Sequence, residues 1–515
     1  MPRSRPNVLF ITADQMRAEC LSIRGHPVVK TPNLDRLAAD GALFANHYGQ
    51  SVPCAPARAS LYCGLYQHKH RLVLNGAPLD ARHSNIALEA RKLGYLPALF
   101  GYTDIAPDPR RLPPGDPTLT TYEGILPGLE PVLPLTDNMK AWRAHLLKKG
   151  YDLPPPEKDF AYLFQQQAAQ SGDPGPTYAP AFFAAEDSNT AFVTDAVLDR
   201  IAGEGDDPWF IHLSYLSPHP PFVVAAPYNS LYDADAIAPP RRRDSLAAEA
   251  DQHPFLAEAL YHPPSRNLTK GRKPIDHHNL DRRALCQVRA TYYGMITEVD
   301  HHIGRILDAL QAQGLYERTL IVFTCDHGEL LGDHWLFGKT TYFDASYHIP
   351  LIVRDPRPEA RRGITVDAFT EAVDVMPSIL AWLGATPPRT CDGRSLLPFL
   401  QGAEPDDWRQ EIHWEFDFRS FSEERSEPLF GLTPEESSMV GQRGKRYKLV
   451  HFAKLPPLLF DLQEDPDEFD NRAEDPAYRD ILLEETQKML SWRIAQDDRT
   501  LTNLRLTDAG IRALG

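Results

Sequence analysis

Polar residues from three distant parts of the sequence have the types needed for metal-assisted nucleophilic chemistry. Asp14 follows the first apolar run of the chain, and Asp326 and His327 follow another. Carboxylate and imidazole ligands suit a divalent ion such as Mn, Zn or Fe and, less well, Ca. Cys54 stands just ahead of a helical pattern, where the positive end of a helix activates a nucleophile. The sequence therefore predicts a metal site beside a reactive residue 54.

Each of these residues also has a plain structural interpretation. Asp14 could cap a turn and His327 could hydrogen-bond within a loop, because both residue types are common after strands. Cys54 could be a buried structural cysteine, which is the usual role of that residue. We favour the chemical interpretation because the residues occur together and because Cys54 belongs to a specific string described below.

The elements that must position these residues alternate between strand and helix. Strands are expected at residues 7–12, 96–100, 209–216, 320–323 and 350–353, and helices at 32–41, 59–65, 86–94, 190–202, 284–310 and 373–383. This alternation predicts an α/β fold in which helices flank a large, mostly parallel sheet. Ligands of such sheets bind beyond the C-terminal ends of the strands. Five polar residues follow predicted strands and should meet at that edge: Asp14, Tyr102, His219, Asp326 and His327.

The chain divides into a large N-terminal part and a smaller C-terminal part. Residues 105–180 are rich in Pro and Gly and predict long surface excursions around a site. Shorter strands are expected at 411–418, 447–452 and 458–462, with a helix at 481–494. We therefore expect a catalytic α/β domain over residues 1–400 and, over residues 401–515, a C-terminal α+β subdomain with an oligomerisation tail.

Charge and composition exclude several kinds of partner. The net charge of −16 makes nucleic acid a poor partner and requires local positive groups to attract an anionic substrate. No run approaches the roughly 18 apolar residues of a membrane span. The apolar run near the start is only four residues long, too short for a signal peptide, so we expect a cytoplasmic protein. The six cysteines form no C-x-x-C pair, which argues against a zinc ribbon or a disulfide framework.

The string Cys54-Ala-Pro-Ala-Arg58, followed by Gly64, resembles the type I sulfatase signature C-x-P-x-R. In that family the cysteine is oxidised to formylglycine by a maturation enzyme. The resemblance runs through nearly the whole chain and implies an alkaline phosphatase-like fold. Within that superfamily the chain is most similar to the phosphonate monoester hydrolases and arylsulfatases. Those phosphonate hydrolases are cytoplasmic, oligomeric and promiscuous, which implies a homodimer or homotetramer here.

The resemblance implies a ligand set for one divalent metal ion. Asp14, Gln15, the modified residue 54, Asp326 and His327 occupy the matching positions. Hydrated formylglycine is a geminal diol, one oxygen of which attacks sulfur or phosphorus. The second hydroxyl then allows the ester intermediate to collapse to the aldehyde and release sulfate or phosphonate.

The resemblance also implies roles for residues around the nucleophile. Arg58 would stabilise the nucleophile and the nearby carboxylates. Lys339 and His219 would bind the substrate oxygens and the leaving-group oxygen, with His219 a candidate general acid. Asn75 and Tyr102 match positions that line the substrate pocket. The alternative for each is structural: Arg58 as a helix charge, His219 as a turn residue and Lys339 as a solvated loop residue.

Two positions depart from the common sulfatase pattern, and a third departs from the phosphonate hydrolase branch. Gln15 stands where many sulfatases have a second aspartate, and His327 stands where many have asparagine. Both changes match the phosphonate hydrolase branch and favour Mn, with Zn or Ca as alternatives. Asp104 stands in the pocket where that branch has threonine. A carboxylate there could repel anions, bind a leaving group or point away.

The predicted activity is hydrolysis of small anionic esters: sulfate monoesters, phosphonate monoesters and phosphodiesters. The first two are tetrahedral monoanions that one dication, a lysine and an arginine can treat alike. Phosphate monoester dianions should react less well. Two alternatives stay open at this point: a metal phosphatase or phosphodiesterase with an unmodified Cys54, and a non-catalytic protein that binds metal and an anion.

Overall fold

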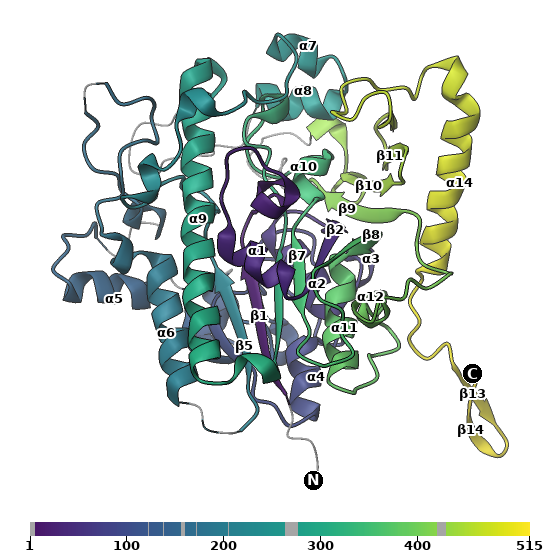
Figure 1. Cartoon of the computed structure of the whole chain (residues 1–515). Helices are drawn as coiled ribbons and strands as arrows, with labels where there is room; N and C mark the ends of the chain where they lie inside the picture. Colours follow the sequence, from purple (N-terminus) through teal and green to yellow (C-terminus); the bar gives the residue numbers. More distant parts are fainter. Residues whose placement is uncertain are drawn as a thin grey trace.

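A large mixed sheet forms the centre of the molecule in the computed structural model (Figure 1). The structure describes residues 6–514 except 122, 137, 156–159, 171, 204, 206, 263–276 and 420–428. The eight strands are, in spatial order, β4 (Glu130–Pro134), β3 (Ala98–Gly101), β5 (Phe210–Tyr215), β1 (Asn7–Ala13), β6 (Thr319–Cys325), β7 (Leu351–Arg354), β2 (Ala42–Tyr48) and β8 (Ile364–Glu371). Only β7 runs antiparallel to its neighbours, so the predicted mostly parallel sheet is confirmed.

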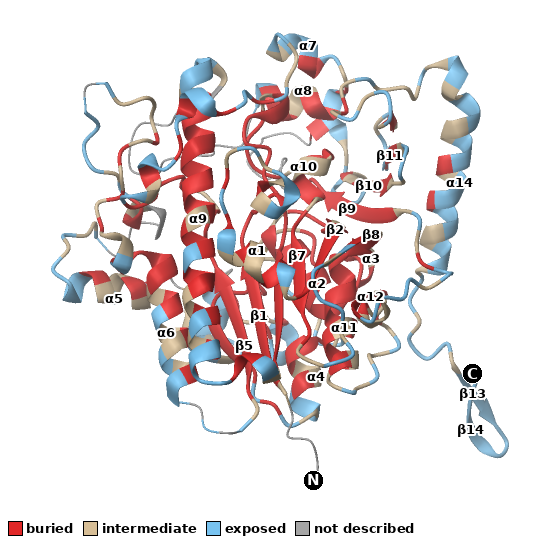
Figure 2. Ribbon diagram, in the orientation of Figure 1, coloured by how far each residue is buried: buried red, intermediate tan, exposed pale blue. Residues whose placement is uncertain are grey.

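Helices flank the sheet in two mutually packed groups. The first group is α1 (Pro32–Ala39), α6 (Asn189–Gly203) and α9 (Arg282–Ala312); the second is α2 (Cys54–Cys63), α4 (Ile86–Lys92) and α11 (Val375–Trp382). Shorter or peripheral helices are α3 (Gln67–His70), α5 (Lys140–Lys148), α7 (Leu246–Ala250), α8 (Pro254–Tyr261), α10 (Asp344–Tyr347) and α12 (Leu397–Leu400). Strands β1, β5 and β6 are buried along their whole length (Figure 2), as expected for central strands covered on both faces.

A second, antiparallel sheet follows in the order β12 (Leu458–Asp461), β11 (Tyr447–Phe452), β10 (Ser438–Arg443) and β9 (Ile412–Asp417). Its inner face shares an aromatic cluster with the large part of the chain, in which the rings of Trp414 and Tyr347 stack at 4.7 Å. This packing joins the two sheets through one apolar layer. The predicted domain division at residue 400 stays a prediction.

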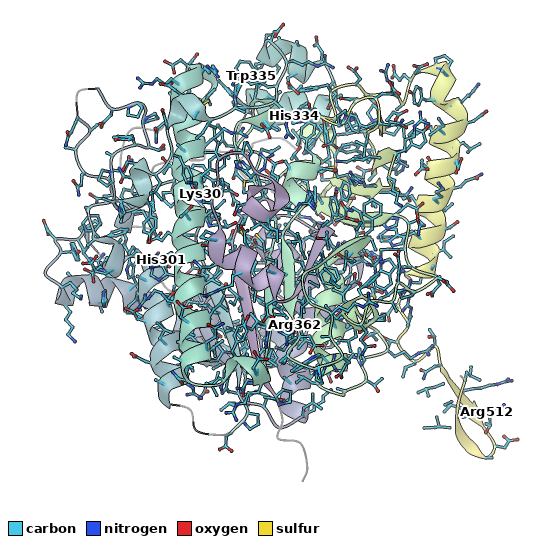
Figure 3. All side chains as sticks on the ribbon, viewed as in Figure 1. Lys30, His301, His334, Trp335, Arg362 and Arg512 are labelled. Carbon is cyan, nitrogen blue, oxygen red and sulfur yellow. The ribbon has the colours of Figure 1, made fainter. Side chains whose placement is uncertain are left out.

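The chain ends in α14 (Arg479–Ala495) and an isolated hairpin of β13 (Leu504–Thr507) and β14 (Gly510–Ala513). The hairpin extends away from the body, with Arg512 at a distance from all other elements (Figures 1 and 3). Leu506 pairs with Ile511 across the hairpin, and Arg505 pairs with Arg512, so apolar and basic side chains occupy opposite faces. Both faces are exposed.

The sequence did not predict β2, β4, β8, β10 or the terminal strands β13 and β14. Strand β8 mixes buried and exposed positions, and the edge strand β4 contains two prolines, so neither reads as a continuous apolar run. Strand β4 and helix α5 lie within residues 105–180, which were expected to be loops. Within the residues that the structure describes, no helix combines the length and the apolar character that a membrane crossing needs.

Candidate active site

The ends of two central strands bring the predicted metal ligands together. Strands β1 and β6 pair in parallel with Ala13 opposite Cys325, so the next residue of each strand, Asp14 and Asp326, emerges at the same edge. One ligand atom each of Asp14, Cys54, Asp326 and His327 lies within 4.8 Å of the other three, and all four residues are buried. The strand-end arrangement predicted from the sequence is present in the structure.

The donor atoms of this cluster fit a divalent cation. Asp14 Oδ1 is buried and has no hydrogen-bond partner among the described residues, although a buried carboxylate oxygen is costly unless it is paired. Burial and the Lys339 ammonium hold the pKa of His327 well below its usual value, so the imidazole is neutral, as a metal ligand must be. Two carboxylates, a neutral imidazole and the side chain at position 54 therefore form a chemically suitable set.

The positive charge of Arg58 offsets the negative charges of Asp14 and Asp326. Arg58 lies one helical turn after Cys54 on α2 and is fully buried. Its Nε donates to Asp326 Oδ2 at 2.9 Å and its Nη2 donates to Asp14 Oδ2 at 3.1 Å. Its Nη1 donates to Ser214 Oγ at 2.9 Å, at the end of β5. The guanidinium thus connects β1, β5 and β6 through charge-assisted hydrogen bonds.

Cys54 is the first residue of α2, whereas the sequence had placed it ahead of a helix that starts at residue 59. The helix starts earlier because Pro56 fits its first turn and because Asn75 Oδ1 accepts from Ala55 N at 3.0 Å. Sγ of Cys54 lies 3.2 Å from both His327 Nε2 and Lys339 Nζ. Burial and the charge of Asp14 raise the thiol pKa well above its usual value, which makes the unmodified thiol a poor nucleophile.

Gln15 and Lys339 contact each other beside Cys54. Gln15 has a left-handed backbone, with φ of 66°, which turns the chain sharply after Asp14. Its Oε1 accepts from Lys339 Nζ at 2.6 Å, and its backbone N–H donates to Asp326 Oδ1 at 3.1 Å. Lys339 is buried, so the solvated loop lysine considered as an alternative is wrong.

His219 and Tyr102 approach the cluster from the ends of β5 and β3. Burial and the Lys339 charge lower the pKa of His219 to about 4, so its ring is neutral in the substrate-free protein. His219 Nδ1 lies 2.6 Å from Pro220 O and must carry the proton that it donates there, which leaves Nε2 as an acceptor. The Tyr102 hydroxyl donates to Asp14 Oδ2, and the Tyr102 ring lies 4.3 Å from the Arg58 guanidinium.

Asp104 is a buried carboxylate in a left-handed conformation, with φ of 55°. It has no hydrogen-bond or ion-pair partner among the described residues. Burial raises the pKa of Asp104 to about 7, and it lies within electrostatic range of Arg58 and Asp14. When it is ionised, this carboxylate lowers the positive charge that Arg58 contributes here.

Sequence reasoning missed three residues that hold this arrangement. Ser214 accepts from Arg58 but lies within the apolar run of β5, so no signal marked it. Glu329, two residues after His327, accepts from the Gln15 amide and from Gly338 N, and the run Asp326-His327-Gly-Glu329 could have indicated it. The third is Arg17, which anchors the loop between Glu329 and Lys339.

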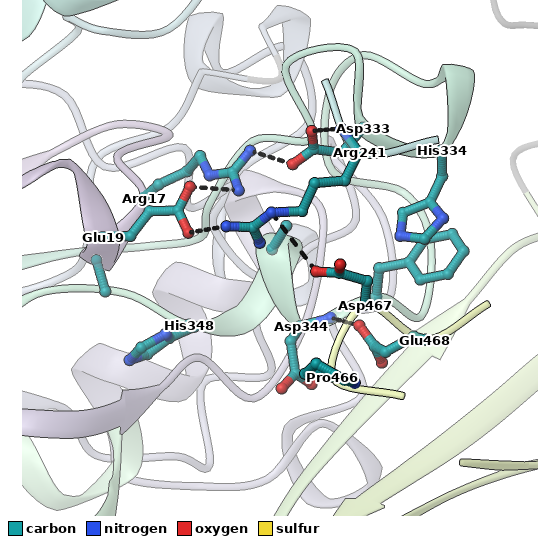
Figure 4. A pocket seen from close by; sticks show the side chains of 13 residues that line it. Arg17, Glu19, Arg241, Asp333, His334, Asp344, His348, Pro466, Asp467 and Glu468 are labelled. Atoms are coloured by element: carbon teal, nitrogen blue, oxygen red, sulfur yellow. Dashed lines mark hydrogen bonds and ion pairs between the residues drawn. The ribbon is translucent and has the colours of Figure 1, made fainter. Parts of the chain in front are cut away.

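Arg17 belongs to a chain of ion pairs beside this loop (Figure 4). Its Nη1 lies 2.8 Å from Asp333 Oδ2 and 3.1 Å from Leu330 O, and its Nη2 lies 2.6 Å from Glu19. Arg241 continues the chain from Glu19, at 3.7 Å, to a C-terminal loop. The adjoining cavity of about 140 Å³ is lined by these paired charges and by none of the predicted site residues. The network therefore holds the loop that carries Lys339.

The fold and the site together define a class of protein. A mostly parallel α/β sheet carries, at its C-terminal edge, a buried carboxylate and imidazole cluster beside a helix N-terminus. This is an alkaline phosphatase-like hydrolase fold with a candidate metal site.

Comparison with known proteins gives the family. The Sulfatase family model matches residues 6–385, and the model of the N-sulphoglucosamine sulphohydrolase C-terminal region matches residues 332–495. The chain belongs to the sulfatase family, within the alkaline phosphatase superfamily. Members of this family generally use a metal ion and a formylglycine residue.

Three relatives illustrate where the chain lies in the family. It is 42% identical to the multifunctional alkaline phosphatase superfamily protein PehA of Trinickia caryophylli, over 99% of both chains. The crystal structure of the phosphonate monoester hydrolase of Agrobacterium radiobacter is similar with a TM-score of 0.93 and 44% identity, over 99% of both chains. An arylsulfatase of Clostridium perfringens is 27% identical over 92% of both chains.

Replacing Arg58 with methionine should destabilise the metal-free protein by about 3–5 kcal/mol, because it leaves two buried carboxylates without their counter-charge. Urea denaturation of metal-depleted protein measures this loss. A divalent ion should restore more stability to the variant than to the wild type, because the dication replaces the missing charge. The matched control is Arg82→Met, whose side chain is 56% exposed and should matter little. A loss at Arg58 no larger than at Arg82 would contradict this account.

Proposed function

We propose that this protein hydrolyses phosphonate monoesters, phosphodiesters and sulfate monoesters with a formylglycine made from Cys54. The observation that carries the proposal is the position of Cys54. It starts a buried helix, contacts Lys339 and His327, and belongs to one cluster with Asp14 and Asp326. The names of the relatives, phosphonate monoester hydrolase and arylsulfatase, support the same two substrate classes.

One divalent ion would be held by Asp14, Gln15, Asp326 and His327 together with the modified residue 54. Bound there, it would supply Lewis-acid activation of the nucleophile and stabilise the charge of the transferred group. The single imidazole and the neutral amide favour Mn over Ca, with Zn as a further alternative. The unpaired Asp14 Oδ1 atom is the feature of the protein that fits this ion best.

Residue 54 would act as an aldehyde hydrate. One hydroxyl oxygen attacks sulfur or phosphorus, the bond to the leaving-group oxygen breaks, and the leaving alcohol takes up a proton. The second hydroxyl then loses its proton as its oxygen re-forms the aldehyde double bond. The bond between the residue 54 carbon and the ester oxygen breaks at the same time, which releases sulfate or phosphonate. Conversion requires a formylglycine-generating maturation enzyme as a partner.

The surrounding cations would bind the substrate and direct protons. Lys339, 3.2 Å from Cys54 Sγ, would bind a non-bridging oxygen of the ester. His219 would donate the proton to the leaving-group oxygen. Because its pKa is about 4 in the substrate-free protein, it would take up that proton when an anionic ester binds beside it and raises the pKa. Asn75 holds the start of α2, and Tyr102 orients Asp14.

Asp104 would limit the charge of the accepted substrate. The predicted dication, Arg58 and Lys339 are opposed by Asp14 and Asp326, and an ionised Asp104 lowers the remaining positive charge further. A monoanionic ester balances such a site better than a dianion does. Phosphate monoester dianions are therefore expected to be the poorest of the related substrates.

The terminal hairpin would join subunits into a homodimer or homotetramer. An isolated two-stranded hairpin is only marginally stable in water, so it needs a packing partner. Leu504, Leu506 and Ile511 are exposed on the apolar face of the hairpin, which extends away from the body (Figure 1). A cytoplasmic location stays a prediction of the sequence alone.

Mass spectrometry of the tryptic peptide 37–58 tests the nucleophile. Protein co-produced with a maturation enzyme should carry an aldehyde at position 54 and hydrolyse aryl sulfates, aryl phosphonates and phosphodiesters. Cys54→Ala should lower kcat/KM for all three by at least about a thousandfold. Cys63→Ala, in the same buried helix, is the control and should stay active. An intact thiol in active protein would indicate an unmodified phosphatase, and metal binding without turnover would indicate a binding protein.

Replacing Asp104 with threonine tests the charge of the pocket. At alkaline pH, where the wild-type carboxyl is ionised, the variant should gain about three- to tenfold in kcat/KM for a phosphate monoester dianion relative to a sulfate monoester. Asp104→Glu keeps the charge and should keep the wild-type ratio. An unchanged ratio in the threonine variant would show that Asp104 points away from the substrate.

Light scattering tests the assembly. The full chain should be a dimer or tetramer, and deletion of residues 497–515 should produce a smaller species. The double variant Leu506→Asp/Ile511→Asp places charge on the apolar face and should act like the deletion, whereas Arg505→Ser/Arg512→Ser on the opposite face should keep the wild-type mass. A monomeric full-length protein would refute the proposal.

A further inference from the structure

The carboxylate of Glu329 lies at the junction of the loop that follows His327 and the loop that carries Lys339. Glu329 is fully buried. Its Oε1 accepts from Leu331 N at 2.9 Å and also from Gly338 N. Its Oε2 accepts from the side-chain amide of Gln15. Both oxygens thus act as acceptors, and one of them faces the residue that follows Asp14.

The other end of the Gln15 side chain meets a donor. Gln15 Oε1 accepts from Lys339 Nζ at 2.6 Å, and the same ammonium lies 3.2 Å from Cys54 Sγ. Hydrogen bonds therefore run in one direction through Glu329, Gln15 and Lys339 to the proposed nucleophile. A flipped Gln15 amide would place oxygen against oxygen at Glu329 and nitrogen against nitrogen at Lys339.

We propose that Glu329 is a positioning residue that holds the Gln15 amide with its oxygen toward Lys339, which lies beside Cys54. The oxygen and nitrogen of a glutamine amide have nearly the same shape, so only hydrogen-bond partners decide which one faces a site. The inference rests on the proposed function, since it assigns Gln15 to the ligand set. Glu329 contacts the nitrogen of the Gln15 amide and not the oxygen that would bind the ion.

The orientation of this amide matters because only its oxygen can bind a cation. Amide oxygens are ligands for hard divalent ions, whereas the NH₂ group has donors and no available lone pair. A flipped Gln15 would direct two N–H groups at the ion and at Lys339. Residues that orient metal ligands typically change metal affinity by about 10–100-fold when they are replaced.

Glu329→Gln is the decisive variant because it keeps the shape of the side chain while it removes the negative charge and turns one acceptor into an NH₂ donor. The new amide oxygen can still accept from Leu331 N and Gly338 N, which preserves the loop. Its NH₂ group then faces Gln15, whose amide must flip to accept from it. The expected result is an increase of about 10–100-fold in the Kd for Mn²⁺, measured by isothermal titration of metal-depleted protein.

A double variant tests whether the loss of Mn²⁺ affinity comes from the orientation of the Gln15 amide or from general disruption of the site. In Gln15→Glu/Glu329→Gln, the carboxylate at position 15 accepts from the new amide and presents its second oxygen to the ion. This double variant should recover the wild-type Kd or bind more tightly. Glu298→Gln, a buried change on α9 next to Ser188, is the control and should leave the Kd unchanged. An unchanged Kd in Glu329→Gln, or no recovery in the double variant, would overturn the proposal.

A readout without metal distinguishes this inference from the function on which it rests. In a crystal structure of metal-free Glu329→Gln, Lys339 Nζ should leave the Gln15 amide, because donor would face donor. A retained contact near 2.6 Å would refute the positioning role even if no variant binds Mn²⁺. If Lys339 is displaced in Glu329→Gln as expected but the wild-type protein binds no divalent ion, only the proposed metal is refuted.

Discussion

The site depends on one electrostatic balance, between the Arg58 guanidinium and the carboxylates of Asp14 and Asp326. All three groups are buried, and Arg58 binds one oxygen of each aspartate. Two carboxylates brought this close in a buried region would repel each other. Arg58 offsets this repulsion, and Asp14 Oδ1 is left without a hydrogen-bond partner among the described residues. The same cation therefore stabilises the strand ends and prepares a site for a dication.

Hydrogen bonds from neighbouring loops hold the other residues of the site in place. Asn75 fixes the start of α2, and therefore the position of Cys54, through the backbone of the next residue. Glu329 and Arg17 hold the loop from residue 328 to Lys339 at two points. Such supports explain how a lysine far along a loop can stay buried next to the nucleophile, since a buried ammonium requires fixed acceptors.

The site's own charges decide which substrates it can accept. The chain carries a net charge of −16, so its overall field repels anions, and the attraction must come from local cations. Arg58 is engaged with Asp14, Asp326 and Ser214, so we expect the attraction to come from Lys339 and the predicted dication. In the proposed function an ionised Asp104 would reduce this local charge further. The proposed site would therefore suit esters with one negative charge, a property that sulfate monoesters, phosphonate monoesters and phosphodiesters share.

The sequence by itself determined the class of fold, the family and the polar residues that gather at the site, because strand-end residues and the Cys54 to Arg58 string are local patterns. It also predicted most helices and the buried central strands. It could not predict β8 or β4, whose mixed burial and prolines hide a strand pattern. The contacts of Ser214, Glu329 and Arg17 were decided only by the tertiary structure. Each joins residues from separate elements, and a hydrogen bond between distant segments leaves no periodic trace in the chain.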